Sequence, residues 1–215
     1  MPHCYKHIIW DWNGTLIEDV AQCVSVLNRM LTRRNLPTLT IEQYRRQFEF
    51  PVLDFYKDLG FNFEQESFDD VAHEYHHDYI KLARRCSLHQ GTEQLLQALN
   101  AAGITQSLLS AYQQDRLEEV VDVFGLRKWF VRMIGLNDYY ARSKVENGKR
   151  WRGELPHEPH EIIFVGDTLH DWEVAQAMGV DSVLVTYGHQ HSDRFKSCKV
   201  PLFDSLPQLQ DFLLG

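Results

Sequence analysis

The first strong pattern in the chain is a short apolar run, residues 7–10, which stops at Asp11 and is followed by the glycine-containing turn Asn13-Gly14-Thr15. A continuous apolar run of this length, bounded by turn residues, is typical of a fully buried strand. We therefore predict a buried strand that carries a carboxylate at its C-terminal end.

The next stretch, from residue 18 to residue 85, has helical periodicity. Apolar residues recur three or four positions apart in four successive groups, and the third group is followed by Gly60, a common helix stop. Thr40 and Gln43 have the spacing of a capping box that opens the second helix, and Pro51 can occupy the first turn of the third. This block is predicted to be a small all-helical bundle.

Beyond residue 88, helical and strand-like patterns alternate. The expected helices span residues 92–102, 115–124, 144–151 and 172–178, and the expected strands span residues 105–110, 131–136, 162–165 and 182–186. Strands separated by short helices indicate a parallel sheet with helices on both faces. The predicted fold class is therefore α/β, with the sheet interrupted once, by the helical block.

Composition narrows the class of protein. Hydrophobic residues make up 44% of the 215 positions, which suits a packed core and argues against disorder. The formal net charge is −8 and no basic run occurs, so we expect no nucleic-acid binding. No apolar run approaches the roughly 20 residues of a membrane span, and we recognise no signal peptide. A cytoplasmic protein is expected, with free thiols at Cys4, Cys23, Cys86 and Cys198.

Polar groups follow three of the predicted strands. Asp11 ends the first, Ser110 ends the second, and Asp167 and Asp171 follow a third. An aspartate after a strand is often only a helix N-cap. However, the ligands of parallel sheets bind beyond the carboxyl ends of the strands, and three carboxylates meeting there need a cation. Oxygen-only ligation with open positions suits Mg²⁺, which would also help an acidic protein to hold an anionic phosphate.

Four motifs in this order resemble those of the haloacid dehalogenase-like hydrolases. Asp11-Trp12-Asn13-Gly14-Thr15-Leu16 resembles the first motif, Ser107-Leu108-Leu109-Ser110 the second, Lys144 the third, and Gly166-Asp167 with Asp171 the fourth. The resemblance covers nearly the whole chain. It implies a Rossmann-like catalytic core made of residues 1–17 and 86–215, with residues 18–85 inserted as a helical cap.

The resemblance also implies a role for each motif. Asp11 would attack phosphorus and form an aspartyl phosphate, which water then hydrolyses. Ser110 and Lys144 would hold phosphate oxygens, and further phosphate contacts would come from Trp12, Gly14, Thr15 and Ala111. Mg²⁺ would be held by Asp11, the main-chain carbonyl of Asn13, Asp167 and, directly or through an intermediary, Asp171. Lys149 is the alternative to Lys144, but it lies closer to the fourth motif than the family usually shows.

One position departs from the family's phosphatases. They usually carry a second aspartate two residues after the nucleophile, where this chain has Asn13, whose amide cannot relay a proton. Acid–base catalysis is typically worth about 10²–10⁴ in rate. We therefore predict a phosphatase that is slow with alkyl phosphates and better with aryl or acyl phosphates, unless His170, His189 or a cap residue supplies the proton.

The activity that we expect is that of a magnesium-dependent phosphatase, acting on a small phosphorylated metabolite in a monomer or homodimer. Phosphoglycolate is the best single substrate prediction, because the length and the cap position resemble that branch of the family. The alternatives are a non-catalytic phosphate- or magnesium-binding relative disabled at Asn13, and a C–P or C–halogen hydrolase of the same superfamily.

Two groups of polar cap residues are expected to lie on solvated helix faces. One group is His73, His76 and His77, for which no third metal ligand is evident. The other is Arg45 and Arg46, for which contact with a substrate carboxylate is the alternative.

Overall fold

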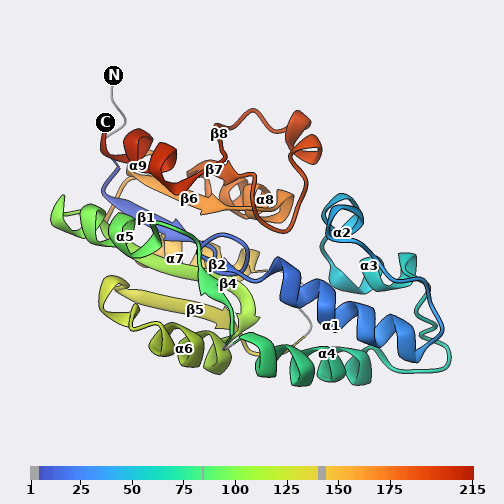
Figure 1. Cartoon of the computed structure of the whole chain (residues 1–215). Coiled ribbons are helices and arrows are strands. Elements are labelled where there is room, and N and C mark those ends of the chain that lie inside the picture. The colour runs from blue at the N-terminus through green and yellow to red at the C-terminus, as the bar shows by residue number, and fades with distance from the viewer. Residues whose placement is uncertain (1–4, 84, 140–143) are drawn as a thin grey trace.

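The computed structural model describes residues 5–83, 85–139 and 144–215, and Figure 1 shows a twisted sheet with a group of helices beyond one end of its strands. Six parallel strands are ordered β5-β4-β1-β6-β7-β8. Their bounds are His7–Trp10 (β1), Thr105–Gln113 (β4), Arg132–Leu136 (β5), Ile162–Gly166 (β6), Asp181–Val185 (β7) and Leu202–Phe203 (β8). The predicted α/β class is confirmed.

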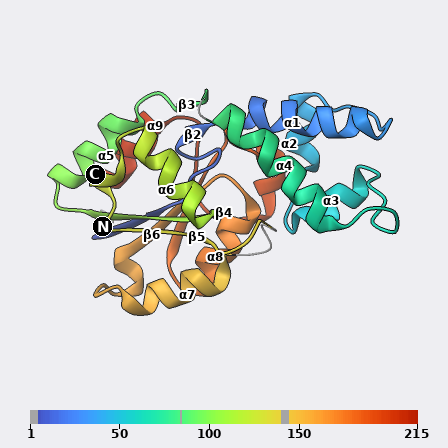
Figure 2. The same ribbon diagram turned by 90° about the horizontal axis from the view of Figure 1, so that it is seen from below.

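Helices cover both faces of this sheet (Figure 2). One face carries α5 (Thr92–Ala101), α6 (Gln114–Val123) and α9 (Leu206–Leu214), and the other carries α7 (Val145–Glu154) and α8 (Leu169–Met178). Successive residues of a strand point to opposite faces. Accordingly, Ile8 and Trp10 join the larger apolar cluster, whereas Ile9 packs with Phe164 in the second. This two-sided burial explains why β1 is apolar throughout.

Four helices are inserted after β1, namely α1 (Val20–Arg33), α2 (Ile41–Gln47), α3 (Val52–Asp58) and α4 (Phe68–Ala83). We call these helices and the loops between them the cap. The chain leaves and re-enters the core through a short antiparallel pair, β2 (Ile17–Glu18) and β3 (Ser87–Leu88). The predicted capping box is present, with Gln43 N–H donating to Thr40 Oγ1 at 3.2 Å and Thr40 N–H donating to Gln43 Oε1 at 2.8 Å.

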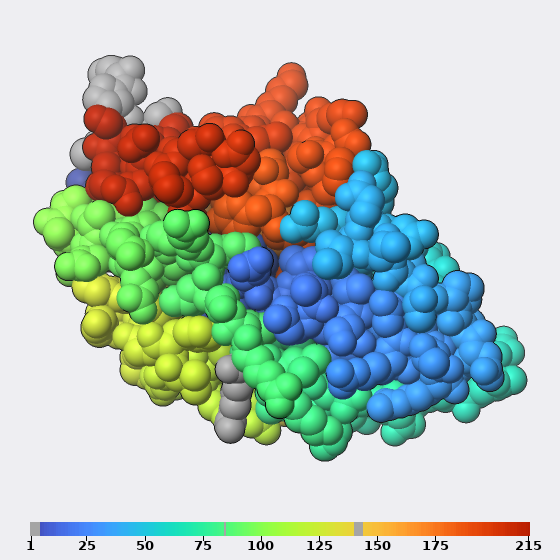
Figure 3. All heavy atoms as spheres, in the orientation of Figure 1, coloured from blue at the N-terminus to red at the C-terminus, as the bar shows by residue number. Residues whose placement is uncertain are grey.

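The cap packs against the segment that follows β7, as the light-blue and orange surfaces of Figure 3 show. The His191 N–H donates to the Arg45 carbonyl at 2.9 Å, and the Gln190 side-chain amide donates to the Phe48 carbonyl at 2.8 Å. The cap therefore covers the end of the sheet where the strand-terminal aspartates lie.

Several boundaries differ from those predicted. β4 continues to Gln113 rather than ending at Ser110, with a shift in its pairing with β5 after Leu109. Lys144 precedes α7 as its N-cap residue rather than opening the helix, and Pro51 likewise precedes α3. β8 and α9 are not among the predicted elements, and for β8 the reason is that a two-residue strand carries no periodic signal.

Two smaller predictions concern the thiols and the membrane. Cys23, Cys86 and Cys198 are free and buried, and Cys4 lies outside the described residues. Within the described part of the chain, no helix has both the length and the apolar character that a bilayer crossing requires.

Candidate active site

Asp11 lies directly beyond β1, at the carboxyl edge of the sheet. Its N–H donates to the Val165 carbonyl at 2.9 Å, which continues the pairing of β1 with β6 and fixes the main chain at this point. The carboxylate is buried and forms an ion pair through Oδ1 with the Lys144 ammonium group. The main-chain bond to Val165 and the ion pair with Lys144 therefore fix the position of the Asp11 carboxylate.

Lys144 connects three groups of the site. Besides Asp11, its Nζ donates to Asp171 Oδ1 at 2.7 Å and to the Leu109 carbonyl at 2.8 Å. Burial lowers the pKa of this ammonium group, but the charges of Asp11 and Asp171 outweigh burial and raise the pKa above its usual value. Lys149 instead pairs with Glu146 on the surface. Lys144 is therefore the lysine that the fold brings to the strand-end aspartates.

Asp167 and Asp171 follow β6, and the Asp167 carboxylate is held by both neighbouring loops. Thr15 Oγ1 donates to its Oδ1 at 3.0 Å, and the His189 N–H donates to its Oδ2 at 2.5 Å. Asp171 accepts from the Thr168 N–H at 2.9 Å and takes part in the capping box that starts α8. Asp171 is thus a helix-capping residue as well as a partner of Lys144.

The three carboxylates offer one oxygen each within 4.8 Å of one another, so they are close enough to share an ion. Burial raises the pKa of Asp11 to about 8 and that of Asp167 to about 6, despite the opposing charges of Lys144 and His189. These raised pKa values indicate too little positive charge around the cluster. A bound cation would keep both groups ionised.

The second predicted motif forms the neighbouring wall. Ser110 and Ala111 lie where the pairing of β4 with β5 shifts, and both line the cavity next to Asp11. Irregularities of this kind re-aim side chains at active sites. The Ser110 Oγ accepts from the Tyr112 N–H at 3.1 Å, which fixes the rotamer of the hydroxyl group.

The turn after Asp11 packs tightly against Asp167. Gly14 has φ +74°, and a Cβ at this position would lie 2.5 Å from the His189 ring and closer still to Asp167. Thr15 is fully buried and its hydroxyl group is hydrogen-bonded to Asp167. The Trp12 indole packs in the apolar core near Phe124. The side chain of Trp12 therefore lies away from the cavity, so its contribution to phosphate binding would come from the main chain.

Asn13 belongs to a buried network centred on Asp19, which the sequence analysis did not identify. The Asn13 amide donates to Asp19 Oδ2 and to the Tyr79 oxygen, both at 2.8 Å. The Tyr79 hydroxyl donates to the same carboxylate at 2.6 Å, and the Gly14 N–H donates to its other oxygen at 2.9 Å. The amide of Asn13 is thus fixed by two partners at the edge of the cavity.

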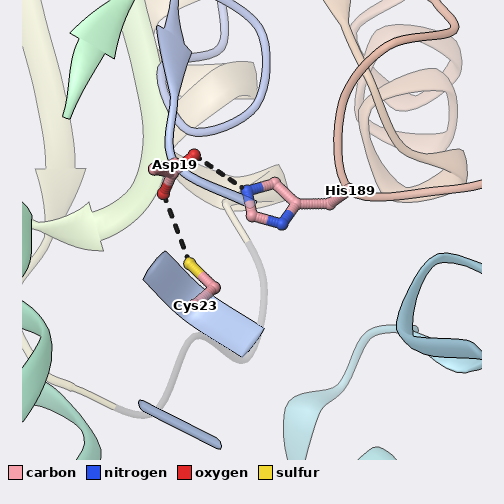
Figure 4. Close-up of side chains that lie close together, drawn as sticks. All are labelled: Asp19, Cys23 and His189. Carbon is pink, nitrogen blue, oxygen red and sulfur yellow. Dashed lines mark hydrogen bonds and ion pairs between the residues drawn. The ribbon is translucent and has the colours of Figure 1, made fainter. Parts of the chain in front are cut away.

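Figure 4 shows the Asp19 carboxylate between the His189 ring and the Cys23 thiol, at 3.2 and 3.4 Å. Burial alone would raise the pKa of Asp19, but the charge of His189 outweighs it and holds this pKa at about 2. Burial lowers the pKa of His189, whereas Asp19 raises it to about 9. The two residues therefore form a buried ion pair near neutral pH, and Tyr44 binds the other ring nitrogen of His189 at 2.9 Å.

His189 is named from the sequence only as a possible proton donor, and nothing in the sequence marks it as a partner of Asp19. A polar residue before an apolar helix resembles an ordinary N-cap, and a histidine in a polar loop after a strand is usually exposed. His170 is placed near Lys144, whose N–H donates to it at 3.5 Å.

A cavity of about 130 Å³ connects these groups to the cap. Its lining includes His76, so the prediction that His76 lies on a solvated face is wrong, while His73 and His77 are exposed as predicted. Ala72, Tyr75, His76 and Tyr79 recur at helical spacing, which turns one face of α4 toward the cavity. Arg45 and Arg46 do not line it.

Comparison with known proteins agrees with this geometry. Residues 8–185 match the family described as haloacid dehalogenase-like hydrolase. The tyrosine-protein kinase PtkA of Mycobacterium tuberculosis (strain ATCC 25618 / H37Rv) is 25% identical over 188 residues, covering 86% of this chain and 64% of PtkA. The phosphoglycolate phosphatase of Vibrio vulnificus (strain YJ016) is 29% identical over 153 residues, covering 70% of this chain and 64% of that enzyme.

The match therefore spans less than two thirds of the length of each of these two relatives. Among solved structures, a predicted phosphatase from Clostridium acetobutylicum superimposes with a TM-score of 0.82 at 19% sequence identity, covering 98% of both chains. This structural likeness shows that the fold is shared.

Proposed function

This chain belongs to the haloacid dehalogenase-like hydrolases, and from that premise we propose that it is a magnesium-dependent phosphatase that works through an aspartyl phosphate. The proposal depends most on one observation, the buried Asp11 carboxylate held by Lys144 beside Asp167 and Asp171. The phosphoglycolate phosphatases among the relatives support hydrolysis of a small phosphate monoester.

The charges of the site support a divalent cation. Four buried carboxylates, those of Asp11, Asp19, Asp167 and Asp171, face two described cations, Lys144 and the protonated His189. Two negative charges remain among the described residues, and one divalent ion would offset them. Asp11, Asp167 and the Asn13 carbonyl would hold this ion, with Asp171 fixed behind them by Lys144 and Thr168. When bound, Mg²⁺ offsets negative charge on the transferring phosphoryl group.

The protein's own groups account for the remaining requirements. Lys144 offsets part of the cost of ionising the buried Asp11 and orients its carboxylate for attack on phosphorus. Lys144 and the Ser110 hydroxyl would receive phosphoryl oxygens, because both line the cavity beside Asp11. Further contacts would come from the main chain of the turn after Asp11, in which the Gly14 N–H is already bound to Asp19. The Asn13 amide cannot supply a proton to the leaving oxygen, and both of its N–H donors are already used by Asp19 and Tyr79.

The proposal is tested by phosphate release from a panel of phosphate monoesters, with Mg²⁺ or with EDTA. We expect release with Mg²⁺, none with EDTA, and none from Asp11→Asn. Acid-quenched enzyme should carry phosphate on the peptide that contains Asp11, as detected by mass spectrometry. Binding of phosphate esters without any turnover would overturn the proposal in favour of the non-catalytic relative. Phosphate release by the Asp11→Asn variant would overturn the assignment of Asp11 as the nucleophile.

A further inference from the structure

The cap side of the cavity is built from aromatic rings. Tyr44, Phe48, Phe55 and Tyr75 are among its lining residues. The Phe48 ring lies 5.1 Å from the Tyr44 ring and 5.4 Å from the Phe55 ring, centroid to centroid. Offset and edge-to-face contacts at these distances hold rings in place. The substrate therefore meets a rigid, largely apolar wall opposite Asp11.

Among the described residues, the positive charge nearest this wall is that of His189, which lines the cavity but is already paired with Asp19. Arg45 donates to the Tyr187 carbonyl, and Arg46 pairs with Glu42 and Asp193 on the surface. His76 lines the cavity, but burial lowers its pKa to about 4, so the ring is neutral at pH 7. A carboxylate on the leaving group would be buried there without a counter-charge of its own, because Asp19 already offsets His189, and such burial is unfavourable.

Part of the hydrogen-bond capacity around the cavity is used within the protein, whereas His76 Nδ1 is buried without a partner among the described residues. The Tyr44 hydroxyl is paired with His189, and the Tyr79 hydroxyl is paired with Asp19. Breaking either bond to receive a polar substrate group would leave a buried polar atom of the protein unpaired. Rings without charge, with at most one polar substituent for His76, therefore fit this cavity better than polyhydroxylated or carboxylated groups.

The chemistry at Asn13 leads to the same class of leaving group. The amide is fixed by Asp19 and Tyr79 and cannot supply a proton. A phenol has a pKa of about 10, as in tyrosine, so phenolate departs without the acid that an alkoxide needs. The apolar wall belongs to the cap, whereas the missing proton donor at Asn13 belongs to the core, so the two features are independent of each other.

We propose that the cap cavity binds the aryl group of an uncharged phenol, and that the substrates are aryl phosphate monoesters. This proposal rests on the phosphatase reaction proposed above. An Asp11 oxygen forms a bond to phosphorus as the bond from phosphorus to the aryl oxygen breaks, and the phenolate leaves and takes a proton from solvent. Water then adds its hydroxyl group to phosphorus and releases the Asp11 carboxylate, returning one proton to solvent.

Three monoesters of similar size separate the possibilities: phenyl phosphate, cyclohexyl phosphate and phosphoglycolate. We expect kcat/KM for phenyl phosphate to exceed both others by at least about tenfold, since acid catalysis alone is typically worth 10²–10⁴. Hydrolysis with phosphoglycolate preferred would overturn the aryl proposal and leave the phosphatase standing. Magnesium-dependent hydrolysis of none of the three would overturn the phosphatase itself.

Two phosphonates, which bind but are not hydrolysed, test the binding preference of the cavity apart from the departure of the leaving group. Phenylphosphonate should inhibit at least about tenfold more strongly than phosphonoacetate, a ratio within reach of one or two aromatic contacts. Equal inhibition by the two, or stronger inhibition by phosphonoacetate, would show that the wall does not select aromatic groups.

Cap variants locate the selectivity. Phe48→Ala should raise KM for phenyl phosphate several-fold more than KM for phosphoglycolate, whereas Phe63→Ala, a cap phenylalanine outside the cavity lining, should leave both unchanged. Val52 lines the cavity and is half-buried, so Val52→Arg tests the charge argument at a tolerant position. It should lower the kcat/KM ratio of phenyl phosphate to phosphoglycolate. An unchanged ratio in both Phe48→Ala and Val52→Arg would overturn the assignment.

Discussion

Asn13, which lies two residues after the predicted nucleophile Asp11, donates a 2.8 Å hydrogen bond from its side-chain amide to the carboxylate of Asp19. Tyr79 from α4 completes the arrangement by bonding to both residues. The position at which related phosphatases usually carry an acid is therefore tied, in this chain, to a buried carboxylate and to the cap. Asn13 has a defined structural role, and its replacement has chemical consequences that can be measured.

Asn13→Asp should raise kcat for cyclohexyl phosphate by about tenfold or more, out of the 10²–10⁴ that acid–base catalysis supplies. The new carboxylate would stand beside Asp19, and repulsion between them would raise the pKa of one and keep a proton near the leaving oxygen. Turnover of phenyl phosphate should change much less. Alkyl turnover that stays the same or falls would contradict this account of the proton relay.

Lys144→Met should lower kcat by about 10²–10³, the usual loss when one group that stabilises transition-state charge is removed. The variant leaves Asp11 and Asp171 without their shared counter-ion, so thermal denaturation should also show a lower Tm. Lys149→Met is the matched control, because Lys149 is exposed and pairs only with Glu146 among the described residues. Equal loss in both variants would contradict the assignment of Lys144.

The Asp19–His189 ion pair should make stability depend on pH in a defined direction. The pKa of His189 rises from 6.5 to about 9 on folding, so its contribution is complete below pH 6.5 and is lost as pH rises through 9. For Asp19 the pKa falls from 3.8 to about 2, so that contribution is present above pH 3.8 and is lost below it. The pair is therefore fully effective between about pH 4 and 6.5.

His189→Gln should accordingly be less stable than the unaltered protein by roughly 3 kcal/mol near pH 6, since each pKa unit corresponds to 1.36 kcal/mol. The difference in unfolding free energy should shrink as pH approaches 9. Urea unfolding of both proteins in EDTA at pH 6, 7.5 and 9 measures it. His191→Gln, in the same loop but partly exposed, serves as control. A difference that is constant across this pH range would rule out the buried ion pair.

The sequence patterns predict the sheet, the cap and the strand-end aspartates because each leaves a local signal. Buried parallel strands are continuous apolar runs, and the Thr40–Gln43 capping box is read directly from its spacing. The carboxyl ends of parallel strands share one edge, so Asp11 and Asp167 could be brought together without knowledge of any contact.

The network around Asn13 leaves no such signal. Asp19 and His189 are 170 residues apart, and each looks ordinary beside its neighbours in sequence. The prediction for His76 is wrong because α4 has two buried faces, one packed on α1 and one lining the cavity, whereas its sequence pattern predicts a single apolar stripe. Pairings between distant polar residues depend on the closed arrangement of cap and core, which periodicity does not encode.

Mg²⁺ should raise the Tm of the protein. A ligand that binds only the folded state, at a free concentration 100 times its Kd, stabilises that state by about 2.7 kcal/mol. Asp167→Asn should abolish this rise, since Asp167 supplies a buried carboxylate beside Asp11, whereas Asp211→Asn on the surface of α9 should keep it. Without Mg²⁺, the Asp167→Asn variant should be at least as stable as the unaltered protein. Burial raises the pKa of Asp167 to about 6, so ionisation of its carboxyl group at neutral pH opposes folding. A magnesium-induced rise in Tm that survives in Asp167→Asn would place the ion elsewhere, and no rise in the unaltered protein would remove the metal from the proposed mechanism.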